Sequence, residues 1–116
     1  MQQLSARQLA DWIAECGGPE NDGKERRPKP LLLDVRESWE YELCHLPGST
    51  PMPMSTVPAR LQELDDEADV VVICHHGVRS LQVAMFLEND GFLSIYNLAG
   101  GVDAWARDVD PGMRQY

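Results

Sequence analysis

A cysteine lies where a strongly apolar stretch of the chain meets a polar, glycine-containing segment. The run Val70–Ile73 is β-branched throughout, Cys74 follows it directly, and Gly77 and Arg79 come next. Such a run predicts a buried strand, and ligands of α/β proteins bind at the carboxyl ends of these strands. A tight loop there turns successive backbone N–H groups inward as an anion-binding nest. Because a nest favours the thiolate, we expect Cys74 to be a nucleophile.

The other side chains of this loop have distinct expected roles. Arg79 carries a permanent charge with several donors, and it braces the loop or binds the anionic end of a substrate. His75 and His76 are mostly neutral near pH 7. They could assist proton transfer, contact a partner or only shape the rim of the pocket. The expected substrate-binding residues are His75, His76, Gly77, Val78 and Arg79, with Ser80 supporting the loop.

Two other chemistries also use a cysteine in this setting. Zinc could be held by Cys74, His75 and His76, but adjacent residues do not easily all face one ion. The chain also has no CxxC or HxxxH pair to complete a ligand set. A cysteine phosphatase places five residues between its cysteine and its arginine, whereas four separate Cys74 from Arg79. This shorter loop suits a sulfur atom or a small anion better than a phosphate monoester, so a phosphatase remains a minor alternative. Because the zinc ligand set is incomplete, we predict no metal, and we predict no cofactor.

Strands and helices are expected to alternate, which is the pattern of a mostly parallel sheet with helices on both faces. Pro51 and Pro53 limit their segment to an edge strand or an extended stretch. Three apolar runs predict strands, at residues 31–35, 70–73 and 94–98. Helices are predicted from the Ser5 cap to Cys16, around 37–43, from Ser55 or Thr56 to Leu64, about 80–89 and about 102–106.

Asp34 and Arg36 lie at the end of the first predicted strand, where they could support the loop. Asp34 could accept hydrogen bonds from loop amides or pair with an arginine, and a structural brace is favoured over acid–base chemistry. Cys16 and Cys44 are interpreted as packing residues, because an isolated cysteine behaves as a small apolar side chain.

Composition limits the classes of protein that fit. With 116 residues the chain predicts one domain over 1–116, with an exposed loop at 17–30 and an irregular tail at 108–116. A net charge of −9 argues against nucleic-acid or anionic-membrane binding. Three cysteines without a paired framework, and no visible signal peptide, predict a cytoplasmic location.

Four stretches, in order, resemble the rhodanese family of sulfurtransferases. The segment from Cys74 to Ser80 is similar to that family's active-site loop, Cys-x-x-Gly-x-Arg-Ser. The remaining three stretches are Leu33–Arg36 with Glu40-Tyr41, the turn His45–Ser49, and the closing segment Asn97-Leu98 through Gly100-Gly101-Val102 to Trp105. The resemblance covers nearly the whole chain.

The resemblance implies a compact α/β domain in which Cys74 carries a persulfide held by the N–H groups of residues 75–79. Sulfur would come from thiosulfate or a protein persulfide and pass to a thiophilic acceptor. The tail Trp105–Tyr116 also resembles the end of rhodanese domains fused to enzymes that adenylylate ubiquitin-like sulfur carriers, so a carrier or protein donor is an expected partner. The alternative is a rhodanese-like binding or relay module with little turnover on free thiosulfate.

Overall fold

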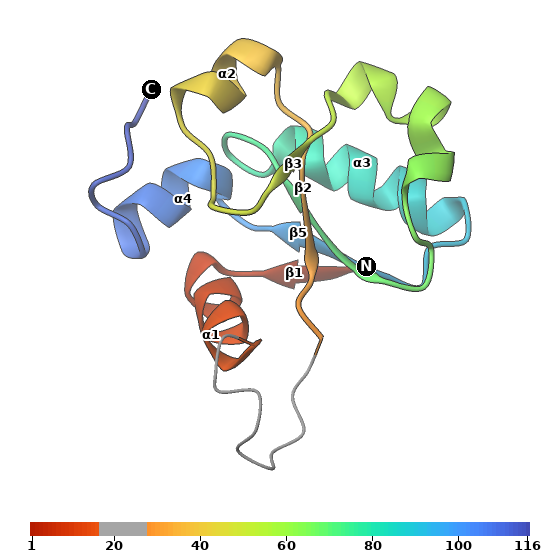
Figure 1. Cartoon of the computed structure of the whole chain (residues 1–116), viewed down its shortest axis with the longest axis horizontal. Coiled ribbons are helices and arrows are strands. Elements are labelled where there is room, and N and C mark those ends of the chain that lie inside the picture. The colour runs from red at the N-terminus through yellow and green to blue at the C-terminus, as the bar shows by residue number, and fades with distance from the viewer. Residues whose placement is uncertain (17–27) are drawn as a thin grey trace.

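A five-stranded parallel sheet forms the centre of the protein in the computed structural model, which describes residues 1–16 and 28–116 (Figure 1). The spatial order β1-β5-β4-β2-β3 places the strand that precedes Cys74 in the middle. The strands are β1 (Gln2–Leu4), β2 (Leu31–Asp34), β3 (Thr50–Pro51), β4 (Asp69–Ile73) and β5 (Ser94–Leu98). The predicted strands at 31–35, 70–73 and 94–98 are confirmed, and the Pro51 segment forms the short edge strand β3.

The described residues also form four α-helices and two short 3₁₀ segments. The helices are α1 (Ala6–Cys16), α2 (Ser38–Leu43), α3 (Val78–Asn89) and α4 (Gly101–Asp108), and the 3₁₀ segments are η1 (Met54–Thr56) and η2 (Pro58–Glu63). Ser5 caps α1 as predicted, since its Oγ accepts the Gln8 N–H at 3.0 Å. In the parts of the chain that the structure describes, no helix has the length and apolar character to cross a membrane.

The sheet is buried on both faces, and alternation along β4 divides its side chains between two cores. Val71 and Ile73 pack with the apolar sides of α1 and α4, including Leu9 and Trp105. Val70, Val72 and Cys74 pack on the opposite face with α3. Because successive residues of a strand point to opposite faces, the thiol of Cys74 faces the α3 side. The predicted α/β architecture with helices on both faces is confirmed.

Two local predictions differ from the structure, and one strand is absent from the predictions. The helix expected from Ser55 or Thr56 to Leu64 is wrong: Pro58 lacks an N–H, Arg60 leaves helical geometry, and two 3₁₀ turns form instead. Helix α3 begins at Val78 rather than near Ser80, because Gly77 reverses the chain at φ +100°. The edge strand β1 carries no strong apolar run and was not predicted.

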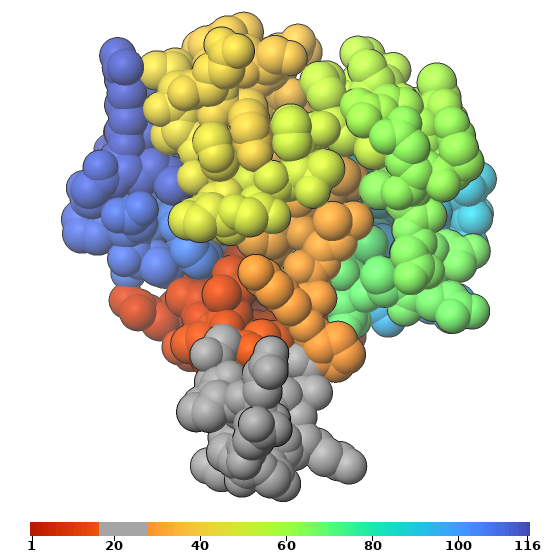
Figure 2. Space-filling model, in the orientation of Figure 1, coloured from red at the N-terminus to blue at the C-terminus, as the bar shows by residue number. Residues whose placement is uncertain are grey.

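Most of the loop predicted at 17–30 lies outside the described residues, at 17–27. Beyond α4, residues 109–116 contain turns and no further helix or strand. Figure 2 shows this tail lying against the part of the surface that carries α2. Contacts of Tyr116 with Trp39 and Glu40 establish the same proximity.

Candidate active site

The thiol of Cys74 is enclosed at the carboxyl end of the central strand. Cys74 is 1% exposed. The backbone N–H of Gly77 donates to its Sγ at 3.0 Å, and the Oγ of Ser80 lies 3.3 Å from the same atom. Gly77 forms the N-cap of α3 in the left-handed region, so the chain curls around the sulfur before the helix begins. The geometry provides a donor N–H and a helix N-terminus for an anionic sulfur.

A chain of neutral hydrogen bonds lies beneath the thiol. Ser80 Oγ donates to Oδ1 of Asn97 on β5. The Nδ2 of Asn97 donates to Gln3 Oε1 at 2.9 Å and to the carbonyl of Gly77 at 3.2 Å. Ser80 and Asn97 are buried, so these bonds satisfy polar groups that would otherwise destabilise the core. These hydrogen bonds fix the first turn of α3, and with it the position of the Gly77 N–H.

The first turn of α4 lies directly against the loop backbone. The N–H groups of Val102 and Asp103 donate to the carbonyls of Cys74 at 2.9 Å and His75 at 3.1 Å. A Cβ atom on Gly101 would lie 2.3 Å from the Cys74 oxygen and 2.4 Å from the His75 oxygen. Only glycine allows this approach, and Gly101 also has φ +58°. Two loop carbonyls are thereby held against the first turn of α4.

Arg79 is held by a carboxylate of α2. Its Nη1 and Nη2 donate to the two oxygens of Glu40 at 2.6 and 2.9 Å. These hydrogen bonds lower the pKa of Glu40 to about 2, although burial of the carboxyl opposes the shift. The same bonds raise the pKa of Arg79. The charge of Arg79 is therefore balanced locally, and of the two roles predicted for it the geometry fits the loop brace better than an anion-binding group.

A second ion pair lies next to the first, and Tyr116 joins the two. Arg36 pairs with Asp34, as the 2.7 Å contact between Nη2 and Oδ2 shows. Its Nη1 donates to the Tyr116 hydroxyl at 2.9 Å, and that hydroxyl donates to Glu40 Oε2 at 2.6 Å. Burial and the bond to Glu40 raise the pKa of Tyr116 to about 12, so the phenol stays protonated as a donor. Hydrogen bonds of Tyr116 and Glu40 thus connect the Asp34–Arg36 pair to Arg79 of the loop.

Two histidines of the loop lie in a stack of rings at its outer side. The ring of His75 stacks on Tyr116 at 3.8 Å and 9°, and on His76 at 3.9 Å and 27°. Burial, and next the charge of His76, lowers the pKa of His75 despite the opposing effect of nearby carboxylates. His76 is exposed, and so is Val78, at 66%. Neutral His75 adds no positive charge to the loop at pH 7.

The structure brings most of the predicted site residues together. Gly77 and Ser80 contact the Sγ of Cys74, whereas the side chain of Val78 is exposed to solvent. Cys44 contacts Arg36 through its carbonyl, at 2.6 Å from Nη2. Sequence reasoning assigned no role to three further residues, Glu40, Asn97 and Tyr116. A buried charged position on a helix cannot be recognised from one sequence, and nothing local to Tyr116 indicates its long-range contacts.

The fold and this site define a class: an α/β domain with a buried cysteine in a tight loop at the carboxyl end of its central parallel strand. The chain can be assigned further. The model of the rhodanese-like domain matches residues 20–108, and the chain therefore belongs to the rhodanese-like domain family.

Individual relatives agree with the family. The chain is 40% identical over 89 residues to the Arabidopsis thaliana protein "Rhodanese-like/PpiC domain-containing protein 12, chloroplastic", covering 73% of this chain and 30% of that protein's length. It is 38% identical over 77 residues to a "Sulfurtransferase" of Allochromatium vinosum, covering 66% of this chain and 72% of the relative. A crystal structure of a rhodanese-like domain protein from Staphylococcus aureus superposes with a TM-score of 0.75 at 25% identity, covering 100% of this chain and 99% of the other.

Proposed function

We propose that the protein is a sulfurtransferase that carries a sulfane sulfur as a persulfide on Cys74. One observation supports this most strongly: the Sγ of Cys74 lies in a loop that directs the Gly77 N–H toward it at 3.0 Å. An anionic sulfur bound to Sγ would meet the same loop and the N-terminus of α3. The relationship to a named sulfurtransferase fits this chemistry.

The proposed reaction proceeds in two displacements. The Cys74 thiolate attacks the outer sulfur of a donor such as thiosulfate, the S–S bond of the donor breaks, and sulfite leaves with the electron pair. The product is a cysteine persulfide whose terminal sulfur carries the negative charge. A nucleophilic acceptor, such as cyanide or a thiolate, then attacks that terminal sulfur and releases the Cys74 thiolate. Covalent catalysis divides one difficult transfer into two easier ones, and the fixed N–H groups stabilise the charge.

The electrostatics of the site favour a protein donor or acceptor over free thiosulfate. Glu40 balances Arg79, and the whole chain has a net charge of −9. A small dianion therefore approaches an acidic domain whose loop arginine is already paired. A basic partner surface, in contrast, would be attracted. We propose that the physiological exchange takes place with another protein, in a reducing compartment such as the cytoplasm, where the thiol is maintained.

Turnover assays test the enzymatic function. Wild-type protein given thiosulfate or a low-molecular-weight persulfide as donor and cyanide as acceptor should form thiocyanate. Cys74→Ser should lose this activity, whereas the control Cys44→Ser should retain it. Equal activity of wild type and Cys74→Ser would overturn the proposal. Absence of turnover with either donor would leave only the binding-module interpretation.

Salt dependence tests the preference for a protein partner. Raising ionic strength from about 0.01 to 0.15 M shortens the Debye length from about 30 to about 8 Å. Screening should speed thiosulfate turnover, because it weakens repulsion between like charges, and should slow transfer to a basic carrier protein. If neither rate responds to salt, the acidic surface has no part in partner choice.

A further inference from the structure

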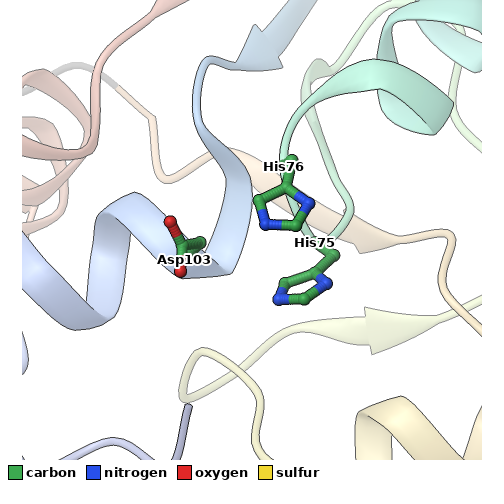
Figure 3. Close-up of side chains that lie close together, drawn as sticks. All are labelled: His75, His76 and Asp103. Carbon is green, nitrogen blue, oxygen red and sulfur yellow. The ribbon is translucent and has the colours of Figure 1, made fainter. Parts of the chain in front are cut away.

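Three metal-ligating side chains meet beside the catalytic loop. His75, His76 and Asp103 each offer one ligand atom, and these atoms lie within 4.8 Å of one another (Figure 3). The two imidazoles come from the loop that follows β4, and the carboxylate comes from the first turn of α4. Cys74 is not a member of this cluster. The zinc site that the sequence analysis considered and set aside used Cys74 as its third ligand, whereas this cluster has Asp103 in that position.

Backbone contacts hold the elements that carry the ligands. The Asp103 N–H donates to the His75 carbonyl at 3.1 Å, and the glycine contact of Gly101 keeps α4 against the loop. The stack of Tyr116 on one face of His75 further limits the orientation of that ring. A metal binds an imidazole at the ring edge, so this stack is compatible with coordination. Much of the ordering cost of a ligand set is thus already met by the fold.

The charges around the cluster also suit a cation. Imidazole nitrogens and a carboxylate oxygen are ligands that a dication of the zinc class takes. The Asp103 carboxylate supplies negative charge beside the two rings, whereas the charge of Glu40 is already balanced by Arg79. The Nη1 of Arg107 donates to Oδ2 of Asp103 at 3.0 Å, so a metal would take the Oδ1 atom.

We propose that His75, His76 and Asp103 bind one transition-metal dication of the zinc class, an activity separate from sulfur transfer. Imidazole with carboxylate suits zinc, nickel and copper better than magnesium or calcium. Zinc–nitrogen bonds of about 2.0–2.1 Å place tetrahedral ligand atoms roughly 3.3 Å apart. The side chains therefore close around the ion on binding, with exposed His76 and half-buried Asp103 making the adjustment. Three protein ligands leave the fourth position to water or an exogenous ligand.

Metal titrations of the 116-residue chain test this site without any turnover measurement. Zn²⁺ affinity is measured by competition with a chromophoric chelator, and Co²⁺ binding is followed by its visible absorption. His76→Gln and Asp103→Asn should each weaken Zn²⁺ binding about tenfold or more, as removal of a ligand requires. There are two matched controls. His45→Gln removes an exposed imidazole away from the cluster, and Asp108→Asn removes an exposed carboxylate of α4, the helix that carries Asp103. Both should leave the Zn²⁺ affinity unchanged.

The same titrations identify a competing explanation. If the metal bound only to the nucleophile, Cys74→Ser would abolish binding, His76→Gln and Asp103→Asn would not, and Co²⁺ would show a thiolate charge-transfer band. That result would overturn the proposal, as would stoichiometric binding that is equally weak in all variants and in wild type. Thermal unfolding of each variant without metal identifies any variant that has lost its fold. If one of the two ligand variants is unfolded, the Zn²⁺ affinity of the other is compared with that of its matched control, and that ratio tests the proposal.

Discussion

The two sides of the loop that follows Cys74 are built from different interactions. Beneath the thiol, Ser80 and Asn97 form a neutral, buried hydrogen-bond chain. On the outer side, Glu40–Arg79 forms one of two ion pairs that Tyr116 connects. Neutral bonds position the sulfur without adding charge, whereas the ion pairs attach the loop to α2 and to the tail.

For the proposed Cys74 persulfide, this difference means that an anionic sulfur would be stabilised with little free positive charge at the loop. The loop arginine is paired with Glu40, so its contribution is mainly geometric. Stabilisation of charge then rests on backbone donors such as the Gly77 N–H and on the N-terminus of α3. Variants that disturb the geometry of the loop should therefore have larger effects than variants that only change its charge.

The largest effect is expected at the contact between α4 and the loop. Gly101→Ala would drive a methyl group into two backbone carbonyls at a left-handed position, costing about 3 kcal/mol of stability and most of the sulfur transfer. Gly91→Ala is the matched control, since Gly91 also has positive φ but has nothing within 4 Å of its Cβ position. It should lose about 1 kcal/mol and retain activity. Chemical denaturation and the thiocyanate assay measure both; similar losses in the two variants would contradict the account.

Arg79→Lys separates a loop brace from a donor-binding charge. Lysine retains the charge but cannot make the two-point contact with Glu40, so the transfer rate should fall about tenfold. Arg60→Lys changes the exposed pair with Glu63 in the same way and should leave the rate unchanged. An unaltered rate in Arg79→Lys would show that charge alone matters and that the brace is unnecessary.

Acid should weaken the ion pairs around Glu40 before it affects the neutral hydrogen bonds of Ser80 and Asn97. The pKa of Glu40 is about 2 in the folded protein against a usual 4.5. Since the unfolded state then binds more protons, this group's stabilisation is complete above pH 4.5 and is lost as pH falls toward 2. Glu40→Gln should destabilise the protein by about 2 kcal/mol at pH 7 and by much less near pH 2.

The comparison is made by urea denaturation of wild type and variant across that pH range. Glu42→Gln, an exposed change on the same helix, should follow wild type throughout. A constant difference between Glu40→Gln and wild type from pH 7 to pH 2 would exclude the ion pair as the source of the stabilisation.

The smallest effect is expected at the hydroxyl that links the two ion pairs. Tyr116→Phe keeps the stack on His75 and removes the bonds to Arg36 and Glu40, costing about 1 kcal/mol and about twofold to threefold in transfer rate. Tyr41→Phe removes a hydroxyl that donates to the Ser49 carbonyl at 2.7 Å, away from the network. It should cost similar stability but leave the rate unchanged, so parallel rate losses would refute a specific role for Tyr116.

The sequence predicts the parts of this architecture that depend on local patterns. The apolar run before Cys74 predicts the central strand, and Gly77 correctly indicates a sharp turn. Contacts between distant segments leave no comparable signal. The role of Arg79 depends on Glu40, 39 residues away, and the link to Asp34 depends on the tail residue Tyr116. Adjacent His75 and His76 also share a ligand cluster with Asp103 only because α4 folds against the loop.

Mass spectrometry of the intact protein after exposure to a persulfide donor or thiosulfate tests the central claim most directly. The account predicts a gain of one sulfur atom in wild type, reversed by cyanide and located by peptide mapping on the segment that contains Cys74. Cys74→Ser should gain none. Sulfur located on Cys16 or Cys44, with Cys74 unmodified, would contradict the account.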